Sequence, residues 1–327
     1  MTMLSVVLRM GRAAAFLTAV LCMHDARAQS WPARPVKVIV PLSAGGTGDT
    51  LARVVSEEMG RILGQPFVVE NRPGSGGSIG TEAVARAAPD GYTLVSASPS
   101  HVINPALRPK SGYDAVRDFA PITVIANTHQ VLLGHPSVPA NTVPELIAYL
   151  KKNPGRLNYG SAGSGSATHL NAELFKSMTG TYIVHIPYRG STYARQDLVA
   201  GEVQFAVDGL LPTLPLIRAG KLKAYALCST RRSLIAPEIP TLDEAGVKGY
   251  ASDTWYGMMA PAGTPAPIIA ALHAAGVKAI NTPAIRERLT AQGAELVGNT
   301  PQEFRRMLEK EQVQWANVIK LSGAKVD

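Results

Sequence analysis

Two glycine-rich segments, each between a strand pattern and a helix pattern, constrain the fold of this chain more than any other feature. The first, PLSAGGTGD at residues 41–49, follows the apolar run at 36–40 and precedes apolar residues at helical spacing from Leu51 to Leu63. The second, GSAGSGSATH at residues 160–169, follows a strand pattern at 157–159. Glycine brings backbone N–H groups close to a helix N-terminus, where the helix dipole favours negative charge. The pair predicts a two-sided anion clamp.

The alternative is that each segment is only a tight connection with an N-cap. Nucleotide motifs are not matched. No Gly-Lys-Ser/Thr follows either segment, and no Gly-x-Gly-x-x-Gly opens the first helix. A nucleotide phosphate is therefore disfavoured as the anion.

The first 28 residues have the pattern of a cleaved export signal. Arg9 and Arg12 precede an apolar run of about ten residues, and Ala26-Arg27-Ala28 is a small-x-small cleavage site. The run is shorter than the roughly 20 residues of a membrane span. We expect cleavage after Ala28 and a periplasmic protein.

Composition of the mature chain fits a two-domain protein without disulfides. The full chain has 32 Lys and Arg and 24 Asp and Glu; without the leader, 29 and 23 remain, a net charge of +6 over 299 residues. The basic residues are scattered and not interleaved with aromatic ones, which argues against nucleic acid. Cys228 is the one cysteine left, so no intramolecular disulfide can form, and a buried position is expected.

Strand and helix patterns alternate along the chain. Thr142 to Glu145 and Thr300 to Glu303 are capping boxes, and the second opens a long helix predicted to end at Gly323. Strand patterns occur at 36–40, 67–69, 92–96, 122–125, 131–133, 182–186, 203–207 and 222–227. Such alternation predicts a mainly parallel sheet with helices on both faces, and ligands beyond the carboxyl ends of its strands. With about 115 residues between them, the two loops are expected in different sheets facing one cleft.

Several segments together resemble a known family. They are VVENRPG at 68–74, PDGYTL at 89–94, PYRG at 187–190, PTLDEAG at 240–246, WYG at 255–257 and APAGTP at 260–265. In this order and spacing, over residues 31–327, the chain resembles the receptors of tripartite tricarboxylate transporters, the Bug-type periplasmic solute-binding proteins. The resemblance implies two α/β domains joined by a hinge, closing on a small carboxylate held by loop amides and bridging water.

The resemblance also implies a domain plan, a function and partners. Domain 1 is expected at 29–127 and again, after a return crossing, within 226–327, with domain 2 at 128–225. The implied protein is a monomer that needs no cofactor, binds a small organic carboxylate and delivers it to integral-membrane transporter subunits. The alternatives are a ligand-sensing subunit for a membrane sensor kinase and a periplasmic hydrolase.

Site residues follow from the loops and from the resemblance. Asp49 is expected to organise its loop and cap the helix rather than touch the anion. Gly209 replaces an asparagine that relatives often carry after Asp208, which removes a polar side chain near the cleft. Tyr188 and Trp255 either wall the pocket or pack a domain junction. The predicted ligand-binding residues are Ser43, Ala44, Gly45, Gly46, Thr47, Asp49, Ser98, Ser100, Ser161, Gly163, Ser164, Gly165, Ser166, His169, Tyr188 and Asp208.

Catalysis and metal binding are disfavoured. Residues 76–80 read Gly-x-Ser-x-Gly, the pattern of a nucleophile elbow, but residues 71–75 separate it from the preceding strand, whereas an elbow serine lies at the strand end. His24 is in the leader, and the other histidines are dispersed without ligand spacing. We therefore predict a binding protein with no catalytic residue and no metal.

Overall fold

The computed structural model describes residues 31–108, 111–252 and 254–322. The predicted leader with its cleavage site, and Gly323, lie outside the described residues. Arg34–Asp327 form one compact unit. Both sheets, all the helices described here and the candidate site lie within this unit.

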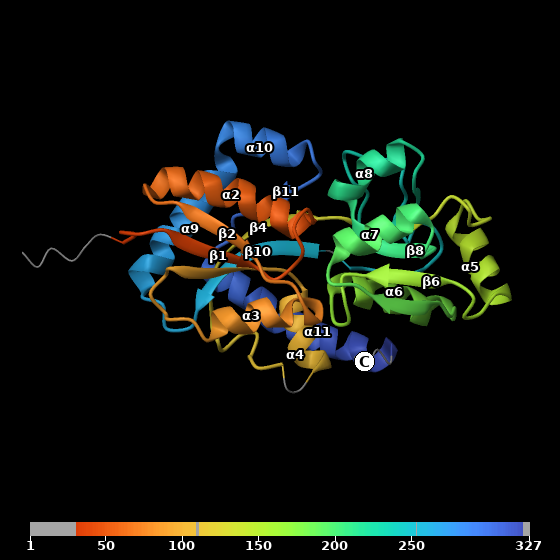
Figure 1. Cartoon of the computed structure of the whole chain (residues 1–327), viewed down its shortest axis with the longest axis horizontal. Coiled ribbons are helices and arrows are strands. Elements are labelled where there is room, and N and C mark those ends of the chain that lie inside the picture. The colour runs from red at the N-terminus through yellow and green to blue at the C-terminus, as the bar shows by residue number, and fades with distance from the viewer. Residues whose placement is uncertain (1–30, 109–110, 253, 323–327) are drawn as a thin grey trace, which may run out of the picture. The chain divides into compact units, whose positions relative to one another are not determined.

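Strands and helices alternate as expected (Figure 1). The strands are β1 (Val36–Val40), β2 (Phe67–Asn71), β3 (Thr93–Ala97), β4 (Phe119–Thr128), β5 (Gln130–Gly134), β6 (Asn158–Ser161), β7 (Val184–Pro187), β8 (Phe205–Gly209), β9 (Lys223–Leu227), β10 (Thr254–Pro261) and β11 (Glu295–Leu296). The helices are α2 (Thr47–Leu63), the 3-10 turn η1 (Ser75–Gly77), α3 (Ser78–Ala85), α4 (Ser100–Leu107), α5 (Val143–Lys152), α6 (Ala167–Thr179), α7 (Ser191–Ala200), α8 (Leu210–Arg218), α9 (Ala266–Asn281), α10 (Pro283–Thr290) and α11 (Pro301–Ser322).

The strands form two sheets. The first has the order β11-β4-β10-β3-β1-β2 and the second β7-β6-β8-β5-β9. In Figure 1, α2, α9 and α10 lie on one face of the first sheet, and α3, α4 and α11 on the other. The chain passes from the first sheet to the second between Thr128 and Gln130, and returns to the first between Leu227 and Thr254. The residue ranges predicted for two domains remain a prediction.

The expectation of mainly parallel sheets is wrong. Among the described strands, β1 pairs in parallel with β2 and β3, and β6 with β7 and β8, whereas β4, β5 and β10 pair antiparallel with all their neighbours. The reason is that β4 and β5 are nearly continuous, with one residue between them, and β10 returns from the second sheet to the first. β10 was also not among the predicted strands, although all eight of its residues are buried.

The capping box at Thr300 forms as predicted, and the one at Thr142 forms only in part, because its glutamate accepts from the residue before the N-cap. The Thr142 hydroxyl accepts the N–H of Glu145, and the Glu145 carboxylate accepts the N–H of Asn141. Thr300 and Glu303 bond reciprocally at the start of α11, through Glu303 N–H to Oγ1 at 3.2 Å and Thr300 N–H to Oε2 at 2.8 Å.

The start of α6 belongs to a core that crosses from one sheet to the other. Ala167 and Leu170 are buried with residues of the first sheet and its helices, among them Val102, Trp255 and Trp315. The rest of α6, through Ala172 and Phe175, packs in the core of the second sheet. One helix therefore links both cores directly behind the second glycine loop.

Within the described residues, no single helix is long and apolar enough to cross a membrane; α9 and α10 meet the length and composition criteria only as a pair, which is bent by 68°.

Truncating Leu170 tests the shared core. Leu170 is fully buried in the core of the first sheet, although the rest of its helix packs in the core of the second, so Leu170→Ala leaves a cavity where the two cores meet and should lower the free energy of unfolding by about 2–5 kcal/mol. Urea denaturation followed by circular dichroism measures the change. The matched control is Leu234→Ala, because Leu234 is 93% exposed and its truncation should have an effect within about 0.5 kcal/mol. Equal stability of both variants would contradict the shared core.

Candidate functional site

A small enclosed cavity of about 30 Å³ lies where the loops of the two sheets meet. Its lining is polar or glycine at most positions. The lining residues are Leu42, Gly46, Thr47, Gly48, Ser98, Ser100, Gln130, Ala162, Ser166, Ala167, Thr168, Ser191, Asp208, Gly209, Thr254 and Tyr256.

Five helices begin at this cavity. Gly46 to Gly48 belong to the start of α2, Ser100 to α4, Ser166 to Thr168 to α6, Ser191 to α7, and Gly209 is the N-cap of α8. Each of these helices follows a strand, and the strands β1, β3, β6, β7 and β8 all run parallel to a neighbour. Helix N-termini carry partial positive charge, so their convergence favours an anion in the cavity.

The first loop leaves its helix uncapped. Gly46 has the extended backbone of an N-cap but no side chain to accept a hydrogen bond. Among the described residues, the N–H groups of Gly46, Thr47 and Gly48 have no protein acceptor, as expected for the first turn of a helix without a cap. These donors lie at the cavity wall.

Asp49 organises this loop. Its carboxylate accepts the N–H of Gly45 at 2.9 Å and the amide of Asn71 at 2.9 Å, and pairs with Arg53 at 3.0 Å. Burial raises the pKa of this carboxyl, but the hydrogen bonds from Arg53, Gly45 and Asn71 outweigh it, and the pKa is lowered. Asp49 does not line the cavity, and the expectation that it caps the helix is wrong, because its carboxylate accepts from Gly45, before the N-cap, and not from the first-turn amides.

The second loop differs, because most of its N–H groups are already bonded within the protein. Ala162 donates to Thr168 Oγ1, Gly163 to Ser161 Oγ, Gly165 to His169 Nδ1 and Ser166 to the Gly163 carbonyl. Two further amides donate to hydroxyls, Ala167 N to Ser100 Oγ and His169 N to Ser166 Oγ. The two loops are therefore not equivalent: the first offers donors, and the second is held in shape by its own side chains.

Two stacked histidines support the second loop from behind. The rings of His169 and His185 lie 4.2 Å apart, and His185 Nε2 is 2.7 Å from Ser161 Oγ, the hydroxyl that accepts Gly163 N–H. Because His169 Nδ1 accepts the N–H of Gly165, this ring must be neutral. Burial, assisted by the charges of Lys176 and Arg108, lowers the pKa of His169 to about 4.

Asp208 is held in a buried ion pair. It is 5% exposed; Oδ2 accepts from Arg195 Nε at 2.8 Å and Oδ1 from Gly209 N–H at 2.7 Å. Burial raises the pKa of this carboxyl, while Arg195, the Gly209 amide and Ser191 act in the opposite direction. The bond to Arg195 leaves the pair close to neutral.

The two walls of the cavity are held together by side-chain hydrogen bonds and by a close approach at a glycine. Arg108 donates to the carbonyls of Ser75 at 2.7 Å and Ser164 at 2.9 Å, and Thr192 donates to the Ala44 carbonyl at 2.8 Å. A Cβ at Gly209 would collide with Thr47 Oγ1. The glycine at 209 therefore allows the two walls to approach closely.

The structure places the predicted site residues in two groups. Those that line the cavity are Gly46, Thr47, Ser98, Ser100, Ser166 and Asp208. Those outside its lining are Ser43, Ala44, Gly45, Asp49, Ser161, Gly163, Ser164, Gly165, His169 and Tyr188. Tyr188 packs behind Gly160 and donates to Asp197 at 2.6 Å. Most of the second group shapes the loops whose other residues form the walls.

Several residues that line the cavity were not predicted from the sequence. Ser191 follows Gly190 at the start of α7, and this glycine before a helix pattern could have predicted it. Gln130 and Thr254 lie on the crossing strands β5 and β10, and no local pattern predicts their meeting. Tyr256 lines the cavity, whereas Trp255, proposed as a wall, faces α11 and donates to Glu311 at 2.7 Å. Adjacent strand residues point to opposite faces, so only one of the two can line the cavity.

The two side chains that could suggest a nucleophile, Ser78 and Cys228, are both buried. Ser78 is buried at the start of α3, seven residues after the end of β2, so it is not on a strand-end elbow. Burial raises the pKa of the Cys228 thiol to about 12, which leaves it unreactive. No group of three His, Cys, Asp or Glu side chains in the described part of the chain could hold a metal ion.

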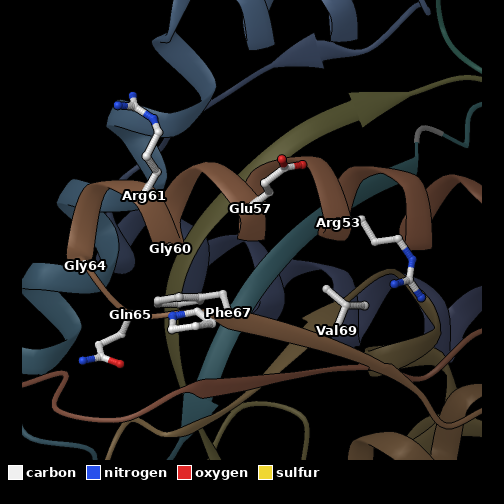
Figure 2. Close-up of a pocket in the computed structure, with 9 residues that line it drawn as sticks. Arg53, Glu57, Gly60, Arg61, Gly64, Gln65, Phe67 and Val69 are labelled. Carbon is white, nitrogen blue, oxygen red and sulfur yellow. The ribbon is translucent and has the colours of Figure 1, made fainter.

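A larger hollow of about 580 Å³ lies elsewhere, between α2 and β2. Figure 2 shows Arg53, Glu57 and Arg61 on the helix above Phe67 and Val69 on the strand. It is wide open, and its arginines are already paired, Arg53 with Asp49 and Arg61 with Glu58. The enclosed cavity, where unpaired donors converge, is the better candidate despite its smaller volume.

Known proteins resemble this chain over most of its length. The model for the tripartite tricarboxylate transporter family receptor matches residues 51–324. Protein BugT of Bordetella pertussis is 38% identical over 301 residues, 91% of this chain and 92% of that protein. The structure of R. palustris Rpa4515 with adipate has a TM-score of 0.87 at 36% identity, covering 91% of this chain and 100% of that one. The structure of MatC (Rpa3494) from Rhodopseudomonas palustris with bound malate has a TM-score of 0.85 at 34% identity, covering 88% and 100%.

Acid should destabilise the fold through His169. Its pKa is about 4 in the folded protein against an ordinary value of 6.5, so between these values the unfolded chain binds more protons and stability falls as pH falls. Between pH 7 and pH 4.5 the loss from this group is about 2 kcal/mol. Urea titrations at both pH values should show a smaller loss for His169→Gln than for the unmodified protein.

The comparison isolates His169, because all other titrating groups are common to both proteins. These include His101, whose pKa burial also lowers to about 4. The same pH dependence in both proteins would contradict the neutral acceptor role of His169.

Proposed function

The chain belongs to the tripartite tricarboxylate transporter receptor family, and we propose that it captures a small organic carboxylate at the enclosed cavity, which widens to admit it, and delivers it to the membrane subunits of the transporter. The geometry of the cavity supports the binding of a carboxylate, and membership of the family supports delivery to a transporter.

The observation that carries the proposal is the uncapped start of α2 among five converging helix N-termini. The amides of Gly46, Thr47 and Gly48 lack protein acceptors within the described residues, and a carboxylate oxygen is the acceptor that such donors favour. Two relatives were solved with adipate and with malate, which are both carboxylates.

The energetics are compatible with micromolar affinity. A hydrogen bond to a charged group contributes about 1.5–3 kcal/mol, and micromolar binding requires about 8 kcal/mol net. Four to six such bonds, with burial of the ligand, suffice after the cost of ordering.

We further propose that the chain acts as a monomer in the periplasm, after cleavage behind Ala28, and performs no chemistry on its ligand. One chain supplies both walls of the cavity, and residues 26–28 carry the cleavage pattern. The buried Ser78 and Cys228 are poorly placed as nucleophiles.

A panel of ligands tests the class of solute. A ligand at 100 times its dissociation constant stabilises the folded state by about 2.7 kcal/mol, which raises the melting temperature by several degrees. Organic mono-, di- and tricarboxylates should include such ligands, whereas uncharged sugars and divalent metals should have no effect. A melting temperature that responds only to a sugar or a metal would refute the carboxylate proposal.

An introduced cap should compete with the ligand. Gly46 has φ −84° and ψ 169°, which suit an N-cap, so Gly46→Asp should accept the orphan amides of α2 itself. The variant should fold with at least the original stability, yet bind a carboxylate from the panel at least about 10-fold more weakly, because a carboxylate of the protein then occupies the donors. Calorimetry measures the affinity, and urea denaturation the stability.

The matched control is Thr142→Asp, which places the same residue at the N-cap of α5, away from the cavity. It should leave the affinity unchanged. Unchanged affinity in Gly46→Asp as well would remove the start of α2 from the binding site.

A further inference from the structure

Asp208 is the only charged side chain among the sixteen described residues that line the cavity. A carboxylate is out of place in a wall built from helix N-termini, since it repels the anion that those termini favour. Arg195 offsets this repulsion through the 2.8 Å bond to Asp208 Oδ2, but Arg195 does not itself line the cavity. Asp208 thus faces the cavity as an acceptor whose charge is balanced from behind.

The hydrogen bonds of Asp208 leave room for one more donor. A carboxylate offers about four lone-pair sites. Arg195 Nε and the Gly209 N–H use two of them, and the Ser191 side chain, which acts to lower the pKa of this carboxyl, lies near a third. Because no described residue fills the fourth site, a donor on the ligand can.

Thr254 supplies a second, independent polar group at the same cavity. It is 1% exposed, it lines the cavity, and its hydroxyl oxygen has no hydrogen-bond partner among the described residues. A buried hydroxyl without a partner costs about 1–3 kcal/mol, so a group that bonds it is favoured at this position.

From these two side chains we propose that the preferred ligand is a hydroxycarboxylate, whose hydroxyl donates to Asp208 and accepts from Thr254. This inference rests on the proposed function, since it assigns the remainder of a ligand whose carboxylate is held at the start of α2. A hydroxyl is both donor and acceptor, which matches an acceptor-only carboxylate and a threonine O–H.

The charges around the site favour a hydroxyl over an ammonium. Arg195 neutralises Asp208, and the surrounding helix N-termini are positive, so a cationic group gains little from Asp208 and is repelled by its surroundings. A methyl group of similar size would leave both Asp208 and Thr254 unbonded. Ligands with a hydroxyl, a methyl and an ammonium at one position should therefore bind in that order.

Calorimetry on a matched series tests the order. The ligands are each enantiomer of malate, methylsuccinate, aspartate and succinate, with lactate and isobutyrate as a second, monocarboxylate pair. The better malate enantiomer, or lactate in its pair, should bind at least about 10-fold more tightly than its methyl analogue. Methyl analogues of equal affinity, or tighter binding of aspartate than of malate, would overturn the proposal.

Variants assign the preference to its residues. Thr254→Val keeps the shape and removes the hydroxyl, and Asp208→Asn removes the charged acceptor; each should reduce the hydroxyl preference several-fold. The matched controls are Thr128→Val and Asp197→Asn. Thr128 pairs with Thr254 across β4 and β10 and also has a buried hydroxyl without a partner among the described residues, but neither Thr128 nor Asp197 lines the cavity.

The outcomes separate this inference from the proposed function. If hydroxy and methyl acids bind alike, or the preference survives in both Thr254→Val and Asp208→Asn, only the inference fails. If no acid of either series binds while another carboxylate of the wider panel does, only the inference fails; if no carboxylate of that panel binds, both fail. If Asp208→Asn does not fold because Arg195 is left unpaired, Thr254→Val alone decides the assignment.

Discussion

The unbonded N–H groups at the start of α2 are the constraint around which the site is arranged. Gly46 cannot cap them, and the fold provides no other protein acceptor among its described residues, so they remain available to a ligand. Neighbouring residues stabilise this arrangement. Asp49 holds the loop in shape from outside the cavity, and Gly209 gives Thr47 the space to approach the second wall.

The second glycine loop solves a different physical problem. Its amides would also be orphans, but protein groups accept most of them, among them Ser161, Thr168 and His169, so the loop is a rigid wall rather than a set of free donors. Rigidity on one side and open donors on the other make the clamp asymmetric. Two loops with similar glycine content therefore have different roles: one offers free N–H donors, and the other is a rigid wall. The difference depends on whether neighbouring side chains accept the loop's N–H groups.

The sequence was sufficient for the local parts of the structure and insufficient for the long-range ones. Both strand–loop–helix units, the helix starts at Thr142 and Thr300, and the cavity-lining Gly46 and Ser166 follow from patterns within about 15 residues, whereas Ser98 was predicted from the family resemblance. The antiparallel insertion of β10, and the meeting of Gln130, Thr254 and Tyr256 at one cavity, depend on strands that come together only after folding. Trp255 and Tyr256 show the limit well, because a shift of one residue in a strand decides which of them faces the ligand.

The near-continuity of β4 and β5 has a consequence for motion. Only His129 separates Thr128 from Gln130, and Gln130 lies in the cavity wall. A rotation of one sheet against the other about this junction moves nearby groups little and distant ones much, as with any lever. The distances in contacts near Gln130 would therefore change little with the angle between the sheets. The distances in contacts farther from the junction would change much more. Residues near Gln130 and residues farther from the junction would then respond separately to any rotation of the sheets.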